Sequence, residues 1–212
     1  LVVDTTPGHV DRLDLLRGGL ADRLVIAVAD GEIVANRPTE AAQAENQRFE
    51  QFAVLGRRFE EALQLAERAI EVHPNSTFVR NRAGAVYANS GQSDKAIDQV
   101  AIALRMNPLD NITSTFTFTV GAVAHFFARR FEESLRWGRR ATAITPQVEI
   151  PRWCAAAALA HLGRIDEARV EIDGILVLHP IATLARARRA SLRHDWMYDL
   201  YLDGLRRAGL PE

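Results

Sequence analysis

Cys154 and His161 are the two residues whose types and spacing come closest to a catalytic arrangement. Both lie in the segment 149–161, which has a helical pattern, and seven residues are two helical turns, so their side chains share one face. A thiol beside an imidazole can act as nucleophile and base. Such a site also needs a third group to orient the imidazole, and none is apparent. We therefore expect Cys154 to be a small packed residue and the chain to be non-catalytic.

Other chemistry is poorly represented. The sequence has no phosphate-binding glycine loop and no H-E-x-x-H motif, its six histidines are scattered, and Cys154 is the single cysteine. We expect no cofactor and no metal site. Glutamate pairs such as Glu60-Glu61 and Glu132-Glu133 begin predicted helices, where negative charge complements the helix dipole. Arg186, Arg188, Arg189 and Arg193 could bind a phosphate or an acidic partner, but we expect them to form a solvated helix face.

Composition and charge narrow the class of protein. The chain has 212 residues, 48% hydrophobic and 25% charged, with a formal net charge of -1. This profile is typical of a globular protein and predicts binding neither to nucleic acid nor to a membrane. One cysteine indicates a reducing compartment, so we expect a cytoplasmic protein. Lys95 is the single lysine among many arginines, which suggests a bacterial GC-rich genome, and the start at Leu1 suggests a piece of a longer polypeptide.

Self-similarity runs through the middle of the chain. Prolines recur at intervals of 34, 38 and 34 residues, and a small residue stands twelve positions before each. Each small residue lies in an amphipathic stretch that follows a short turn, and each turn follows a second helical stretch. The prolines are Pro74, Pro108, Pro146 and Pro180, and the small residues are Ala62, Ala96, Ser134 and Ala168.

These helix–turn–helix units resemble the tetratricopeptide repeat. The second unit matches at Ala83, Gly84, Tyr87 and Gly91, and the fourth has Ala155, Ala156, Leu159 and Gly163 at the same positions. Small residues allow close helix packing, and stacked pairs share a continuous core. The sequence thus predicts an all-α solenoid of about four repeats with helical caps. We expect a linker or cap at 1–38, repeats at 39–74, 75–108, 109–146 and 147–180, and capping helices at 181–212.

The segment "TSTFTFTV", Thr113 to Val120, alternates polar and apolar residues like a β-strand. The repeat frame instead places it in the first helix of the third unit, where the 38-residue interval adds four residues. Phe116, Val120, Val123 and Phe127 fit helical spacing equally well. A lone strand would leave its backbone groups unpaired, so we predict a helix.

The two ends of the chain are less regular. Leu13, Leu16, Leu20, Leu24 and Ala27 follow helical spacing, and Thr39 is a plausible cap for the next helix. After Pro180, residues 182–193 and 195–209 predict two closing helices. The second is expected to be capped by Asp195 and to end at Gly209.

Three phrases resemble a more specific family. "RMNPLDN", "AHFFARRFEESLRWGRRA" and the final "YLDGLRRAGLPE" resemble the carboxyl-terminal tetratricopeptide region of bacterial class III adenylate cyclases and of winged-helix regulators with similar tails. The resemblance covers residues 39–212. It implies that a cyclase or DNA-binding domain lies upstream in the parent protein. Neither domain is recognisable in these residues.

The resemblance to tetratricopeptide repeats also predicts a binding groove, lined by fixed positions of the first helix of each unit. Asn and Arg can bond a peptide backbone or a carboxylate, and Trp153 can act as an aromatic anchor. The third unit is apolar here, which favours an apolar partner segment or a second copy of the chain. The module would therefore be a protein-interaction and regulatory unit. The alternative is a structural spacer or dimerisation module whose groove is filled by its own chain, with residues 1–36 as the filling segment. The groove residues are Phe78, Asn81, Arg82, Asn89, Phe116, Val120, Val123, Phe127, Trp153 and His161.

Overall fold

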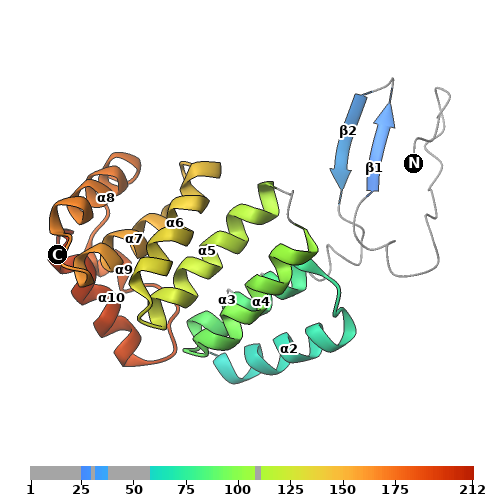
Figure 1. Cartoon of the computed structure of the whole chain (residues 1–212), viewed down its shortest axis with the longest axis horizontal. Coiled ribbons are helices and arrows are strands. Elements are labelled where there is room, and N and C mark those ends of the chain that lie inside the picture. Colours follow the sequence, from blue (N-terminus) through green and yellow to red (C-terminus); the bar gives the residue numbers. More distant parts are fainter. Residues whose placement is uncertain (1–24, 30–31, 38–57, 108–110) are drawn as a thin grey trace. The chain divides into compact units, whose positions relative to one another are not determined.

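The computed structural model of the chain describes residues 25–29, 32–37, 58–107 and 111–212 (Figure 1). The chain divides into two compact units, residues 1–54 and residues 55–212. In the first unit, strand β1 (Val25–Ala29) pairs antiparallel with strand β2 (Glu32–Arg37), and Ala29 stands opposite Glu32. The register shifts between Ala27 and Val28.

This hairpin corrects the helical interpretation of the N-terminal segment at Ala27, which lies in β1. Val25, Ile26 and Val28 flank it, and β-branched residues of this kind favour strands over helices. The other positions of the predicted stripe, Leu13 to Leu24, lie outside the described residues. So do the predicted cap Thr39 and the first helix of the first repeat, and that half of the first repeat stays a prediction.

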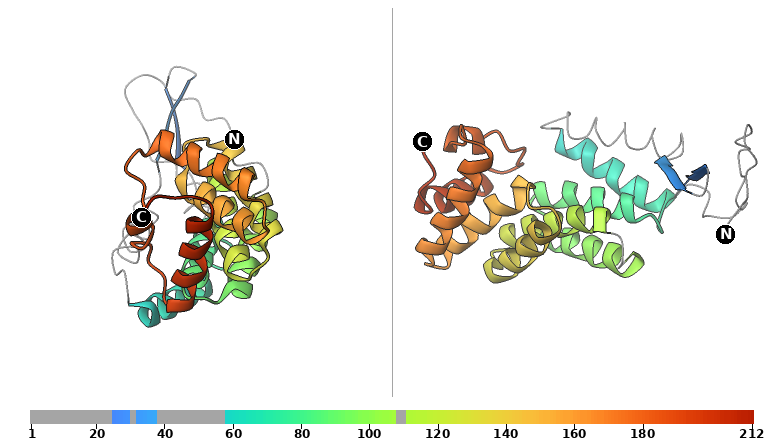
Figure 2. Two further views of the ribbon diagram at one scale, coloured as in Figure 1. Left: turned by 90° about the vertical axis from the view of Figure 1, so that its left-hand side faces the viewer. Right: turned by 90° about the horizontal axis from the view of Figure 1, so that it is seen from above.

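The second unit is helical, and its all-α fold class is confirmed for residues 58–107 and 111–212. Figures 1 and 2 show the helix pairs α3–α4, α5–α6 and α7–α8 stacked in sequence order, with α2 before them and α10 after them. The repeat helices are α2 (Phe59–Val72), α3 (Thr77–Asn89), α4 (Ser93–Met106), α5 (Asn111–Phe127), α6 (Phe131–Ile144), α7 (Glu149–His161) and α8 (Ile165–Leu178).

Small residues hold the two helices of each pair together. Ala96, Ser134 and Ala168 are completely buried, each on the second helix of its pair. The Ser134 hydroxyl also donates a hydrogen bond of 2.8 Å to the carbonyl oxygen of Ala122 on α5. A larger side chain at any of these positions would push the two helices apart.

The segment Thr113–Val120 is helical, which confirms the prediction made from the repeat frame. Helix α5 has 17 residues, whereas α3 and α7, the first helices of the neighbouring pairs, have 13 each. Four residues make about one turn of an α-helix. The extra residues of the third unit are therefore accommodated as one additional turn at the start of α5, which leaves the rest of the helix in phase with its neighbours.

The C-terminal segment forms one short and one longer helix, α9 (Leu184–Ala187) and α10 (Asp195–Arg207). The predicted first closing helix is therefore only four residues long. His194, in extended geometry, is the residue that precedes α10, and the expected cap Asp195 is instead its first helical residue. Gly209 follows with a φ of +94°, as expected for the end of the helix.

Candidate functional site

The inner surface is the face made by the predicted groove positions of α3, α5 and α7. Helix α10 turns back and packs on it. The Nε2 atom of His161, at the end of α7, lies 2.8 Å from the carbonyl oxygen of Leu200 on α10. Gly204 of α10 lies against Ala157 in the middle of α7, with no room for a side chain between them. The chain thus covers the α7 part of its own inner surface.

Aromatic contacts continue this cover from α7 to α5. Phe126 meets Tyr201 of α10 edge-on, with ring centroids 5.9 Å apart. Phe127, a predicted groove residue, is only 7% exposed and meets the ring of Trp196 at 6.1 Å in the same T-shaped geometry. Edge-to-face pairs of this kind contribute beyond the area they bury. Helix α10 therefore covers the end of α5 as well.

The loop before α10 reaches α3 and α2. The backbone N–H of Arg193 donates a hydrogen bond of 3.0 Å to the carbonyl oxygen of Asn89, another predicted groove residue. The guanidinium of the same arginine pairs with the carboxylate of Glu60 on α2. Residues 193–205 therefore run along the inner surface past three successive units.

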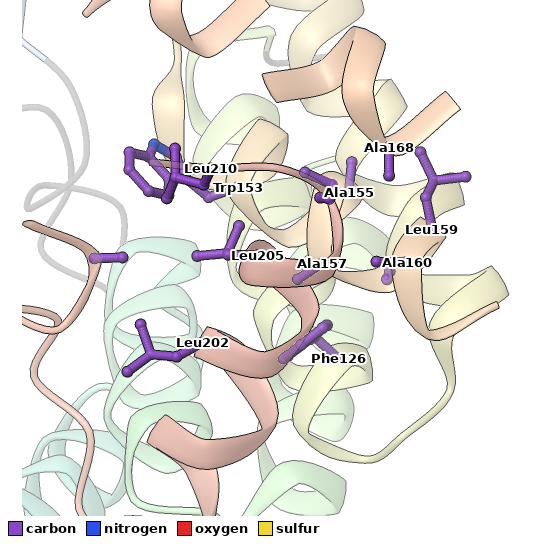
Figure 3. Close-up of a cluster of buried hydrophobic side chains, with 14 of the residues drawn as sticks. Phe126, Trp153, Ala155, Ala157, Leu159, Ala160, Ala168, Leu202, Leu205 and Leu210 are labelled. Atoms are coloured by element: carbon purple, nitrogen blue, oxygen red, sulfur yellow. The ribbon is translucent and has the colours of Figure 1, made fainter. Parts of the chain in front are cut away.

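Burial shows that α10 belongs to the core. Met197 and Leu205 of α10 are completely buried, and Figure 3 shows Leu205 and Leu210 in one cluster with Trp153. Together with Leu200 and Leu202, these α10 and tail side chains correspond to roughly 7–15 kcal/mol of gross hydrophobic stabilisation, taken at about 1.5–3 kcal/mol each. The total stability of a domain is commonly about 5–15 kcal/mol. A ligand would have to disrupt the core to take this place.

The candidate nucleophile is enclosed by the same arrangement. Burial raises the pKa of the Cys154 thiol to about 12, which strongly disfavours the reactive thiolate. Burial also raises the pKa of the neighbouring Tyr201 hydroxyl well above its usual value. His161 holds Leu200 and stacks on Phe131, with ring centroids 4.8 Å apart. The carboxylate of Asp203 on α10 lies 4.0 Å from the Nδ1 atom of His161, so an acidic group does stand beside the imidazole. The Nε2 atom is engaged by the Leu200 carbonyl oxygen, and these contacts join α7 to α10.

The other end of the inner surface is partly exposed. The guanidinium of Arg82 on α3 lies over two aromatic rings, 5.2 Å from the centroid of Phe78 and 4.6 Å from that of Phe116. All three side chains are partly exposed. The two rings hold the cation in one orientation.

Beside this aromatic–arginine cluster (Phe78, Arg82 and Phe116), Asn81 is buried. Its Oδ1 atom accepts a hydrogen bond of 2.9 Å from the Thr117 hydroxyl, and its Nδ2 atom has no hydrogen-bond partner among the described residues. Val120 is also buried, and a Cβ atom on Gly84 of α3 would stand 3.3 Å from one of its methyl groups. Val123 is partly exposed and packs between the two buried clusters of the solenoid.

The ten predicted groove residues therefore fall into three groups, with Val123 between them. Phe78, Arg82 and Phe116 form one partly exposed cluster, Asn81 and Val120 are packed between helices, and Asn89, Phe127, Trp153 and His161 lie under α10 or its flanking segments. Their role in binding stays a prediction. The sequence-based interpretation did not identify α10 as the cover, although residues 195–207 show an amphipathic pattern that requires an apolar partner.

No family model matches the chain, and no curated protein sequence matches it. Solved structures are similar to it. TTC0263, a thermophilic TPR protein in Thermus thermophilus, superposes with a TM-score of 0.58 at 20% identity, over 78% of this chain and 85% of that chain. MamA MSR-1 gives a TM-score of 0.52 at 18% identity, over 77% of this chain and 91% of that chain. These similarities show that residues 55–212 have the fold of a tetratricopeptide-repeat solenoid.

Two properties of the described residues bear on function. No helix in the described part of the chain is both long and apolar enough to cross a membrane. Within the same residues, no three His, Cys, Asp or Glu side chains are grouped so as to hold a metal ion.

Proposed function

We propose that the chain is a non-catalytic protein-interaction module that binds a segment of a partner protein at the aromatic–arginine cluster. The observation that carries the proposal is the placement of Arg82 over Phe78 and Phe116 on the partly exposed part of the inner surface. Aromatic residues and arginine contribute strongly to the energy of protein interfaces. The solenoid fold supports the proposal because it presents neighbouring helices side by side along one extended surface.

The chemistry of the cluster defines the partner. Aromatic rings pack against apolar side chains, and guanidinium groups donate hydrogen bonds to carboxylate or backbone carbonyl oxygens. We expect an apolar segment that carries an acceptor group near its centre. That segment belongs to another protein or to a second copy of this chain.

The self-filled spacer, our alternative function, is favoured by one observation on units three and four. There α10 takes the place that a ligand would occupy, and Leu205 is completely buried. The filling segment proposed from the sequence, residues 1–36, lies mostly outside the described residues. In this alternative the fourth unit stabilises the solenoid, and binding is confined to the second and third units.

A finer proposal concerns the parent protein. The phrases at residues 105–111, 124–141 and 201–212 resemble tails of bacterial adenylate cyclases, and they support a regulatory role for this module in a larger cytoplasmic signalling protein. The test is the sequence encoded upstream of Leu1. A cyclase or winged-helix domain there supports the regulatory role, and any other domain contradicts it.

Peptides selected from a random displayed library test the interaction site. We expect selected peptides to bind the unmodified chain and to lose at least tenfold in affinity, about 1.4 kcal/mol, for Phe116→Ala or Arg82→Ala. Leu65→Ala is the matched control, because Leu65 is an exposed apolar residue on α2 that is not part of the cluster. Equal affinity for all three variants, with unchanged melting temperatures, would place binding elsewhere. Sedimentation of the chain alone reports whether a second copy is the partner.

A further inference from the structure

A hollow of about 410 Å³ lies along α6, beside Arg164, the residue that precedes α8. Four arginines line it together with a single carboxylate and two apolar residues. The lining residues are Glu132, Leu135, Arg136, Arg139, Arg140, Ala143 and Arg164. We call this the arginine hollow. It shares no residue with the aromatic–arginine cluster.

The repeat frame does not account for these arginines. The positions of Arg136, Arg139 and Arg140 on α6 correspond to Asp98, Ala101 and Ile102 on α4, and to Val170, Asp173 and Gly174 on α8. The solenoid therefore packs with acidic, apolar or absent side chains at the same places. Spacings of three and four residues bring the α6 guanidiniums to one face of the helix. Their concentration in one unit indicates a role other than packing.

Arg140 is held in place by an unusual neighbour. Its guanidinium lies 4.3 Å from the centroid of the Phe118 ring, which is itself buried. The residues equivalent to Phe118 in the adjacent units are Arg80 and Arg152, each of which donates to the carbonyl oxygen of the preceding proline. In the third unit an aromatic ring takes the place of this arginine, and the nearby cation is Arg140 of the second helix, α6. Among the residues that the structure describes, no carboxylate pairs with Arg140, so its charge is available in the hollow.

The other three guanidiniums are in exchangeable ion pairs. Arg139 lies 3.2 Å from Glu167, Arg164 lies 2.7 Å from the same carboxylate and 3.4 Å from Glu132, and Arg136 pairs with Glu133. These side chains are mostly well exposed, and exposed pairs of this kind contribute little to stability. An anionic group with more negative charge than a carboxylate, such as a phosphate, can therefore replace these glutamate carboxylates with little loss of stability.

We infer that the arginine hollow binds a small compound carrying two or more phosphoryl charges. Guanidinium groups bond phosphate oxygens in pairs of parallel hydrogen bonds, which favours arginine over lysine at such sites. A hollow of this volume lies within the size range of small-molecule sites. The apolar residues of the lining are Leu135, which is buried, and Ala143, which is exposed and can contact the organic part of the compound.

Inorganic pyrophosphate is the probe for this site. Titration at low ionic strength, followed by calorimetry and by backbone amide NMR shifts, should show saturable binding with the largest shifts at residues 135–143 and 164. Arg136→Gln and Arg140→Gln should each weaken binding at least tenfold. Glu132→Gln should strengthen it, because a competing carboxylate is removed. Arg105→Gln, an exposed arginine of α4 outside the hollow, should bind like the unmodified chain.

Two variants separate charge from stability. Arg140→Gln also removes the contact with Phe118, whereas Arg136→Gln removes an exposed ion pair with Glu133, which contributes little to stability, and should keep the melting temperature. Weaker binding by a fully stable Arg136→Gln variant supports the site. The inference is overturned if sodium chloride of equal ionic strength reproduces the shifts, if no saturation is reached, or if Arg136→Gln binds like the unmodified chain.

Discussion

Gly204 on α10 lies directly against Ala157 on α7. A Cβ atom at position 204 would stand 2.8 Å from the Ala157 Cβ atom and 2.9 Å from its carbonyl oxygen. These contacts involve backbone, which cannot move aside as the end of a flexible side chain can. The close approach of α10 to the inner surface therefore depends on the absence of one methyl group.

Replacing this glycine tests the packing of α10. Gly204→Ala should lower the free energy of unfolding by roughly 1–3 kcal/mol, because overpacking outweighs the gain in helix propensity. Gly174→Ala on α8 is the matched control. Its Cβ would meet only the end of the Arg152 side chain, so a gain of about 0.5–1 kcal/mol is expected. Chemical denaturation measures both, and an equal gain in both variants would contradict the described contact.

The small positions of the repeat provide a second test. Ala96→Leu and Ala168→Leu should each cost roughly 1–3 kcal/mol, because both alanines are completely buried between the helices of a pair. Ala143→Leu, at an exposed position of α6, should have little effect. Melting curves followed by circular dichroism compare the three variants. Unchanged melting temperatures at positions 96 and 168 would count against the repeat alignment.

The single thiol reports on the burial of α7. Because the pKa of Cys154 is raised to about 12, a native sample at mildly alkaline pH should react very slowly with a disulfide reagent such as Ellman's. Complete reaction should follow unfolding in guanidinium chloride. Gly204→Ala should accelerate labelling of the folded protein if α10 is loosened. Rapid labelling of the unmodified native chain would contradict the burial of Cys154.

His125 makes stability depend on pH. Burial lowers the pKa of its imidazole in the folded chain, and Arg130 and Arg136 lower it further against the opposing effect of Glu133. The unfolded chain therefore binds more protons as the pH falls below about 6.5, so the contribution of this residue is present above that pH and is lost below it. Chemical denaturation at pH values of about 7.5 and 5.5 measures how much the free energy of unfolding falls between the two. This fall should be smaller for His125→Leu than for the unmodified chain. If the free energy of unfolding falls by the same amount in both proteins, His125 is not the group whose titration changes the stability.

The repeat architecture was predictable because its signals reinforce one another. Pro108 and Pro146, together with Ser134, fixed the frame of the third unit, and that frame overruled the strand-like alternation around Phe116. Tertiary packing thus decided a segment whose local propensity pointed the other way. The same reasoning failed at Ala27, where no repeat frame exists and the β-branched neighbours form a hairpin.

The use of the inner surface was less predictable. The pattern of residues 195–207 shows that α10 has an apolar face, but it does not specify which surface receives that face. Trp153 and His161 have the residue types of a binding site, and both are used by the chain itself. The repeat frame assigns Val120 to the groove, but Val120 is buried and lies close to Gly84 on α3. Contacts of this kind depend on how two helices that are distant in sequence fit together, which the pattern of a single helix does not specify.

The return of α10 along the inner surface changes how this solenoid should fold. In a linear repeat array each unit contacts only its neighbours, so the ends can unravel one unit at a time. Here Arg193 pairs with Glu60 across 133 residues, and Leu200 meets His161 across 39. The C-terminal segment also contacts α3 through Asn89 and α5 through Phe127, so opening of the last unit should involve the loss of contacts on the second and third units. Amide hydrogen exchange should accordingly be slow and similar in α3, α5 and α7, as in a cooperative globular domain.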